Sequence, residues 1–282
     1  MFDWLAWENP VSFWWVFLTS ISAINILLWF WTRMYRYSGV SFRSVFEFRK
    51  NPQSLIWFSS LYVFVCAFRS VMPRADVQRI VLFDTWFSSV FFGRTIATIA
   101  ELAFIAQWAI VLMILSEAAK DKWTRKISLT ILPVIAIAEM FSWYAVITTH
   151  YLGNVVEESL WGLTYVAIGS AIASLWFKLK GPIRLAAGIS IIFCALYVLF
   201  MFTVDVPMYY GRMMQDMASQ KPHLSFTQGI YDLNTRWVVT HDIQEWKTEI
   251  PWKTLYFSFA VWVSLALCYL PLSADKIKKY LK

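Results

Sequence analysis

Three polar residues recur at helical spacing inside an apolar run of the sequence. Arg94, Thr98 and Glu101 occupy positions i, i+4 and i+7 of "GRTIATIAELAFIAQW", which places them on one face of a helix. Arg94 and Glu101 are about 10 Å apart along the helix axis. We therefore expect them to meet only by extending toward each other, or through Thr98, water, a neighbouring helix or a ligand. Ionisable residues within a membrane mark functional sites by default, and an outward-opening polar pocket is the economical interpretation.

A second carboxylate falls near the middle of another apolar run. Glu139 has Trp143 one turn away and His150 at i+11 on roughly the same side. A lone buried carboxylate is costly when ionised, so it must pair, take up a proton or contact water. We predict that Glu101 and Glu139 form the floor of the pocket and act as acid and base. The aromatic residues around Glu139 would shape an apolar lining and stabilise a developing cation.

The other polar residues of the outer half are expected to bind the substrate, with the two arginines holding an anionic head group such as a phosphate. These residues are Arg69, Arg94, Thr98, Trp143, His150, Glu158 and Asp205. Some also have structural explanations: Asn154 and Glu157 form a capping-box-like helix start, and Arg69 and Asp205 fit snorkelling or end-capping. A purely structural polar network that ties the helices together stays an alternative.

The histidines and cysteines form no recognisable ligand motif. His150, His223 and His241 could join Glu157, Glu158 or Asp242 in a zinc or copper site, but their spacing favours surface histidines. The three cysteines lie inside apolar runs without C-x-x-C spacing, which is typical of buried small residues. We therefore predict no metal ligands, and the sequence identifies no cofactor.

The composition predicts an all-α integral membrane protein. Of the 282 residues, 59% are hydrophobic and 19% aromatic, well above the roughly 45–50% apolar content of soluble domains. Seven runs approach the length of about 20 residues that crosses a bilayer. They cover residues 11–31, 53–72, 91–115, 127–148, 155–177, 183–204 and 252–272. We expect a bend near Gly93, with residues 77–90 lying partly along the membrane interface.

The distribution of Lys and Arg predicts the orientation of the bundle. Residues 33–51, 117–126, 178–184 and the tail after residue 273 hold sixteen of the 25 basic residues. Basic loops stay in the cytoplasm, which gives an N-terminus outside and a C-terminus inside. The absence of Lys or Arg before Arg33 indicates that the first run stays as a span rather than a cleaved signal peptide. A bacterial cytoplasmic (inner) membrane is the simplest location.

We predict a single polytopic domain over residues 1–282, because no linker or internal repeat divides the chain. The long extracytoplasmic connection before the last helix, residues 206–251, is expected to act as a lid over the bundle or to dock a protein partner. The net charge of +7 reflects topology and contact with membrane lipids, and nucleic-acid binding is not expected.

Three functions remain open on these residues. The first is an enzyme that acts on a lipid or isoprenoid-like amphiphile with buried carboxylates. The second is a proton- or cation-coupled transporter or channel that uses the same carboxylates as a relay. The third is a membrane-anchored binding or assembly subunit that contacts its partner through residues 206–251.

Overall fold

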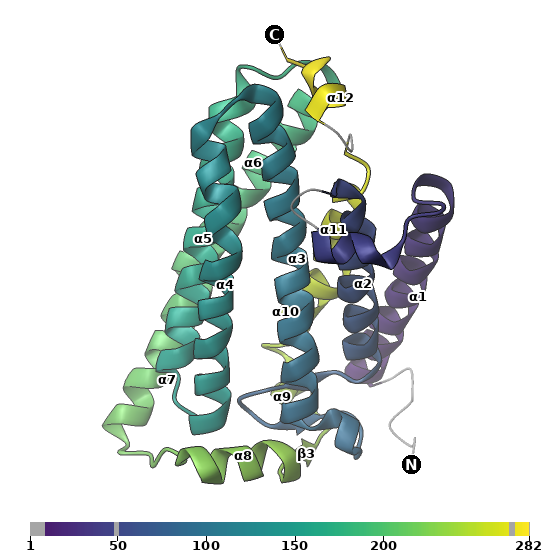
Figure 1. The fold of residues 1–282 in the computed structure, drawn as a ribbon. Helices are drawn as coiled ribbons and strands as arrows, with labels where there is room; N and C mark the ends of the chain where they lie inside the picture. The colour runs from purple at the N-terminus through teal and green to yellow at the C-terminus, as the bar shows by residue number, and fades with distance from the viewer. Residues whose placement is uncertain (1–8, 48–50, 271–273, 282) are drawn as a thin grey trace. The chain divides into compact units, whose positions relative to one another are not determined.

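The computed structural model describes residues 9–47, 51–270 and 274–281 and is 80% helical. Six of its helical stretches are long and apolar enough to cross a membrane, and a seventh apolar helix, Leu55–Val71, is shorter. The prediction of an all-α, multi-pass membrane architecture is therefore confirmed (Figure 1). The count of seven spans, the orientation and the single domain stay predictions.

The chain divides into two compact units. Unit 1 comprises Met1–Val40, Ile56–Phe104 and Phe226–Cys268, and unit 2 comprises Ser41–Leu55, Ile105–Ser225 and Tyr269–Lys282. The third long helix, α3 (Val90–Ala119), contributes its first half to unit 1 and its second half to unit 2.

Unit 1 combines apolar helices with a small sheet. Its elements are α1 (Pro10–Arg36), α2 (Leu55–Val71, except its first residue), β1 (Arg74–Ala75), β2 (Ile80–Val81), η3 (Trp86–Ser88), the start of α3, α8 (Phe226–Thr235), β3 (Val238–Val239), α9 (Ile243–Trp246), α10 (Ile250–Leu255), η5 (Tyr256–Ala260) and α11 (Val261–Leu267). The sheet has the order β1-β2-β3, with β1 and β2 antiparallel and β2 and β3 parallel. It joins the segment between α2 and α3 to the segment before the last helices.

Unit 2 is built mainly from long antiparallel helices. Its elements are η1 (Phe42–Glu47), η2 (Pro52–Ser54), the second half of α3, α4 (Lys122–Thr148), α5 (Leu152–Trp176), α6 (Gly181–Phe200), η4 (Met201–Asp205), α7 (Val206–Ala218) and α12 (Ala274–Lys278). Asp121 caps α4 by accepting a hydrogen bond from the Thr124 N–H at 2.9 Å. Gly153 lets α5 approach α4, because a Cβ there would lie 2.4 Å from the Phe141 carbonyl oxygen.

The structure corrects two expectations about helix limits. The helix α3 is continuous from Val90 through Gly93, so there is no break at Gly93, and β2 and η3 occupy parts of the segment 77–90 that was expected to lie partly along the membrane interface. Residues 206–251 are not a single loop, because α7 continues the helical run of α6 and η4, and α8, β3 and α9 follow. The whole run Gly181–Ala218 has 38 residues. At 1.5 Å per residue it is about 57 Å long, well beyond the roughly 30 Å of a hydrocarbon core.

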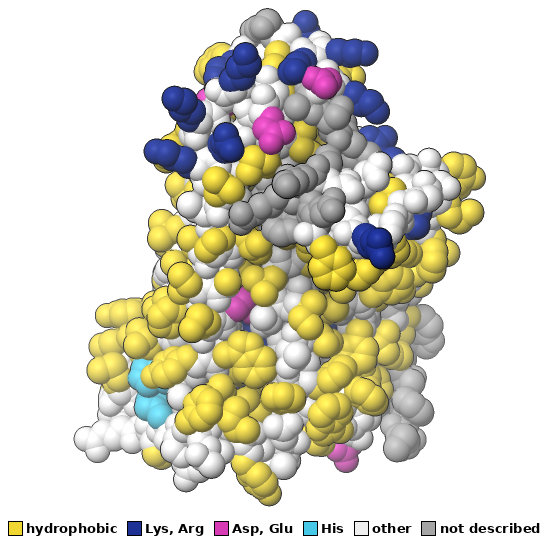
Figure 2. All heavy atoms as spheres, viewed as in Figure 1, with side chains coloured by type: hydrophobic (Ala, Val, Ile, Leu, Met, Phe, Trp, Pro, Cys, Tyr) yellow, Lys and Arg dark blue, Asp and Glu magenta, His cyan; other side chains and the backbone are white. Residues whose placement is uncertain are grey.

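The surface of unit 2 has the pattern of a membrane protein. Figure 2 shows Lys and Arg side chains gathered at the end that holds α12, and hydrophobic side chains over the middle. Along α6, the exposed Leu185, Ile189, Ile192 and Leu196 form one stripe at helical spacing. Such a stripe is unfavourable in water and is suited to contact with lipid.

Candidate functional site

Glu101 forms the centre of a buried polar cluster in unit 1. Arg94 Nη2 donates to Glu101 Oε2 at 2.8 Å, so the two residues extend toward each other and pair directly. Arg69 of α2 lies nearby, with its Nη1 4.0 Å from Glu101 Oε1. Thr98 lies between Arg94 and Glu101 on α3 and is half-buried. The arrangement matches the helical face that the sequence predicts for these three α3 residues, and it adds Arg69.

Tyr256 is the member of this cluster that sequence reasoning missed. Its hydroxyl donates to Glu101 Oε1 at 3.1 Å, across a separation of 155 residues in the chain. Its ring makes an edge contact with Tyr62, at 5.8 Å between centroids, and the Arg69 guanidinium lies 5.9 Å from its centroid. A single tyrosine in an apolar aromatic run carries no sequence signal that distinguishes it from packing residues.

A π-helical turn carries Tyr256. The segment η5 interrupts the α-helical pattern of the last apolar helix. Buried Asn25 of α1 donates to the Phe257 carbonyl oxygen at 3.0 Å and accepts from Trp262 Nε1 at 2.9 Å. A π-helical turn shifts backbone hydrogen bonds out of register, and the amide of Asn25 satisfies one of the affected carbonyls. These contacts join the turn that carries Tyr256 to α1 within unit 1.

The turn after α2 brings two further charged residues to this cluster. Arg74 Nε donates to Asp76 Oδ1 at 2.6 Å, and Arg74 Nη1 donates to the Ser89 carbonyl oxygen at 3.0 Å. Burial opposes ionisation of Asp76, but the positive charges of Arg74, Arg69 and Arg94 outweigh it and lower the pKa of Asp76. Asp76 is therefore a carboxylate at neutral pH, and its charge interacts with Arg74 and with Arg69 and Arg94, the two arginines that contact Glu101.

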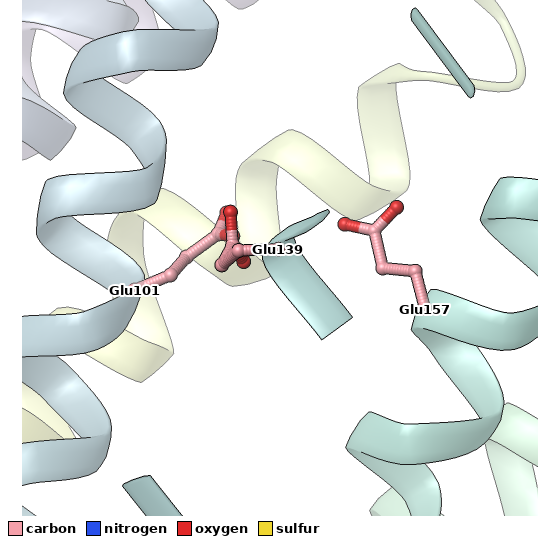
Figure 3. Close-up of side chains that lie close together, drawn as sticks. All are labelled: Glu101, Glu139 and Glu157. Carbon is pink, nitrogen blue, oxygen red and sulfur yellow. The ribbon is translucent and has the colours of Figure 1, made fainter. Parts of the chain in front are cut away.

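Unit 2 holds a pair of buried carboxylates. A carboxylate oxygen of Glu139 on α4 lies within 4.8 Å of a carboxylate oxygen of Glu157 on α5, and both residues are buried (Figure 3). Asn154 Nδ2 donates to Glu157 Oε2 at 3.4 Å. Asn154 is not the N-cap expected from the sequence, since α5 begins two residues earlier, at Leu152. The amide of Asn154 instead contacts the Glu157 carboxylate from inside the helix.

The other predicted site residues of unit 2 lie on several elements. Trp143 is half-buried on α4, Glu158 is half-buried on α5, and Asp205 is buried on the π-helical segment η4. His150 follows α4, and its ring lies 4.2 Å from that of His223, centroid to centroid. His241 belongs to unit 1, where its Nε2 lies 3.0 Å from the Leu82 carbonyl oxygen.

The sequence prediction that Glu101 and Glu139 form one pocket joins residues of different units and stays a prediction. Within unit 1, Arg69, Arg94 and Glu101 come together with Tyr256, and within unit 2 Glu139 comes together with Glu157. Comparison with protein-family models, curated proteins and solved structures finds no significant match for this chain. The function must therefore be inferred from the two groups of buried polar residues, one around Glu101 and one formed by Glu139 and Glu157.

Proposed function

We propose that the protein is a membrane-embedded enzyme that uses buried carboxylates for acid–base chemistry on a lipid or isoprenoid-like amphiphile. In this proposal it crosses a bacterial cytoplasmic membrane seven times, with its N-terminus outside. The observation that carries the proposal is the Arg94, Glu101 and Tyr256 cluster, in which a buried carboxylate contacts both a cation and a hydroxyl donor.

The contacts of Glu101 support a role as proton acceptor. Arg94 at 2.8 Å and Arg69 at 4.0 Å both favour the charged carboxylate. The hydroxyl of Tyr256, at 3.1 Å, offers a route for a proton to and from that carboxylate. A carboxylate held in this way is expensive to maintain for packing alone, since apolar residues of similar volume often fold as well or better.

Glu139 and Glu157 support a complementary role as proton donor. Two carboxylates within 4.8 Å of each other repel when both are charged, and burial increases that repulsion. The pair is therefore suited to holding one proton between its two members. One carboxylate kept charged and another kept protonated is the division of roles that acid–base enzymes use.

The test replaces Glu101 by Gln, which keeps the shape of the side chain and removes its ability to accept a proton as a carboxylate. The matched control is Glu117→Gln, at an exposed position on the same helix. Each purified protein is incubated with total lipid from its native membrane, and mass spectrometry follows the consumed and formed species. We expect the wild type and the control to convert a lipid at similar rates. Glu101→Gln should reduce that rate at least about a hundredfold, which is the usual contribution of a general acid or base. Equal conversion by a folded Glu101→Gln protein would refute the proposal.

A proton- or cation-coupled transporter is the second candidate function, and the π-helical segments favour it. η4 and η5 interrupt two apolar helices, and they carry Asp205 and Tyr256 respectively. Interrupted helices with polar groups at the break are common in transporters, and π-helical turns cluster at functional sites. Proteoliposomes with a pH-sensitive dye separate the two functions: gradient-driven proton or cation flux that Glu101→Gln abolishes, without lipid conversion, favours transport.

A further inference from the structure

Arg74, which the sequence did not single out, has an unused donor at the start of α3. Its side chain is 2% exposed, and two of its nitrogens donate to Asp76 and to the Ser89 carbonyl oxygen. Its third nitrogen, Nη2, has no hydrogen-bond partner among the residues that the structure describes. An unpaired buried donor on a charged group is costly, and in native proteins it commonly indicates a bound water or ion.

The guanidinium group of Arg74 lies directly against the first turn of α3. A Cβ at Gly93 would be 1.1 Å from Arg74 Nη1 and 1.7 Å from Nη2, so only glycine leaves room for the group. Ser89 begins this turn, since its side chain accepts from the Phe92 N–H at 3.3 Å and its carbonyl accepts from the Gly93 N–H at 3.2 Å. The first turn of a long helix carries a partial positive charge. A buried cation at this end of a helix is unfavourable unless an anion accompanies it.

The charges around Arg74 leave an excess of positive charge. Among the described residues of unit 1, Arg69, Arg74 and Arg94 outnumber the carboxylates of Asp76 and Glu101 by one cation, and the partial charge of the helix start adds to this excess. The neighbouring ion pairs do not correct this excess. Asp232 is shared between Arg79 and Arg236, which adds a second surplus cation.

We propose that Arg74, Arg69 and the first turn of α3 bind a phosphoryl group. The excess of one to two positive charges matches a phosphate ester, and its several oxygens can accept from guanidinium and helix N–H donors together. Arg94 is engaged with Glu101, so this assignment moves the predicted anion-binding role from Arg94 to Arg74. The assignment names the head group of the proposed amphiphile and to that extent rests on the proposed function. A lipid head group and free phosphate share this chemistry.

The experiment measures thermal unfolding of the purified full-length chain in a neutral maltoside detergent, because a ligand of the folded state raises the midpoint. Three probes are titrated: dioctanoyl phosphatidic acid, dioctanoylglycerol and inorganic phosphate, the last with chloride added to hold ionic strength constant. The first two differ only in the phosphoryl group. We expect phosphatidic acid to raise the midpoint and dioctanoylglycerol to leave it unchanged. Stabilisation by inorganic phosphate alone would support the same site with free phosphate as its ligand.

Two variants locate the site at Arg74. Arg74→Gln removes the donor, and Gly93→Ala keeps the charge but displaces the guanidinium. Each is expected to weaken phosphatidic acid or phosphate binding about tenfold or more, as expected for loss of a charged hydrogen bond. Their controls are Arg125→Gln, at an exposed position on α4, and Gly211→Ala, where a Cβ meets nothing within 4 Å. Both controls should bind like the wild type.

Several outcomes would overturn the proposal. The first is that phosphatidic acid and dioctanoylglycerol shift the unfolding midpoint of the wild type equally while phosphate does not shift it. The second is that Gly93→Ala binds phosphatidic acid or phosphate as tightly as the wild type. If Arg74→Gln does not fold, Arg74→Lys replaces it, and it should bind more weakly than the wild type. Binding and lipid conversion are separate measurements, so the two proposals can fail independently. If phosphate binds through Arg74 but lipid conversion does not depend on Glu101, only the proposal of an anion site stands. If conversion depends on Glu101 but phosphate does not bind through Arg74, only the proposal of an enzyme stands.

Discussion

At the scale of single residues, the buried ion pair of Arg94 and Glu101 affects both the stability of the protein and its proposed activity. Both side chains are buried, and Glu101 also accepts from Tyr256. Removal of one partner of a buried pair leaves an uncompensated charge, whereas removal of both does not. This asymmetry separates the contribution of the pair to folding from its contribution to activity.

Arg94→Gln should therefore destabilise the protein by about 3–5 kcal/mol. The double variant Arg94→Gln with Glu101→Gln should recover most of this loss while remaining inactive. Thermal unfolding in detergent measures the first effect, and the lipid-conversion assay measures the second. A double variant that is as unstable as Arg94→Gln alone would contradict a direct coupling between the two side chains.

His150 gives a pH-dependent prediction at the same scale. Burial and the neighbouring His223 lower its pKa, and Asp216 opposes them only in part. In the unfolded chain a histidine has a pKa near 6.5, so as the pH falls through that value the unfolded state takes up a proton before the folded state does. Stability should therefore decrease as the pH falls from about 7.5 to below 6.5. Unfolding midpoints measured across this range should depend less on pH in His150→Gln than in the wild type, and an equal dependence in the two proteins would contradict the prediction.

The sequence identified Arg69, Arg94 and Glu101 of the buried cluster but not all of their partners. Arg94, Thr98 and Glu101 share a helical face because helical spacing fixes it, and Arg69 was assigned to the same site from its place near the end of the second apolar run. Tyr256 and Arg74 could not be found in this way. The contact of Tyr256 with Glu101 depends on long-range packing, and the contact of Arg74 with Gly93 depends on the backbone path through the β1–β2 turn.

At the scale of elements, the π-helical turn η5 depends on a single amide from another helix. Asn25 of α1 contacts both the Phe257 carbonyl oxygen and Trp262 Nε1, so it links α1 to two turns of the last helices. A buried carbonyl without a donor costs about 1–3 kcal/mol. This amide therefore supports the placement of Tyr256 without contacting Glu101 itself.

Asn25→Leu should destabilise the protein by about 1–3 kcal/mol and also reduce lipid conversion, because the shift of η5 moves the Tyr256 hydroxyl. The control is Asn234→Leu, which removes an amide that contacts only the Ile230 carbonyl of its own helix α8. Unfolding midpoints and conversion rates of the two variants provide the comparison. Full activity in a destabilised Asn25→Leu protein would indicate that η5 has a folding role only.

The sequence predicts some of the helices and not others. Runs of apolar residues predict long helices because every backbone group in a bilayer must be hydrogen-bonded within the protein. The same pattern contains no signal for η4 and η5, because their residue types do not distinguish a π-helical turn from an α-helical one. It also missed α7 as a continuation of α6, since Asp205 and Pro207 read as the end of a span, although proline is tolerated in the first turn of a helix.

At the scale of the whole molecule, the orientation in the membrane is the prediction on which the placement of every site depends. Basic residues concentrate near the α3–α4 and α5–α6 turns, which is typical of cytoplasmic ends. The turn between α4 and α5 and the end of α7 would then face outward. The histidine pair His150 and His223, next to the α4–α5 turn, would accordingly be reached from the outer side.

Single introduced cysteines test this orientation directly, because the three native cysteines are buried and should not react with a membrane-impermeant maleimide. Ser219→Cys, after α7, should be labelled in intact cells, whereas Lys178→Cys, at the α5–α6 turn, should be labelled only after the membrane is opened. Both positions are exposed, so a difference between them reports the side of the membrane rather than burial. The reverse pattern would place the basic turns of unit 2 outside and would contradict the predicted orientation.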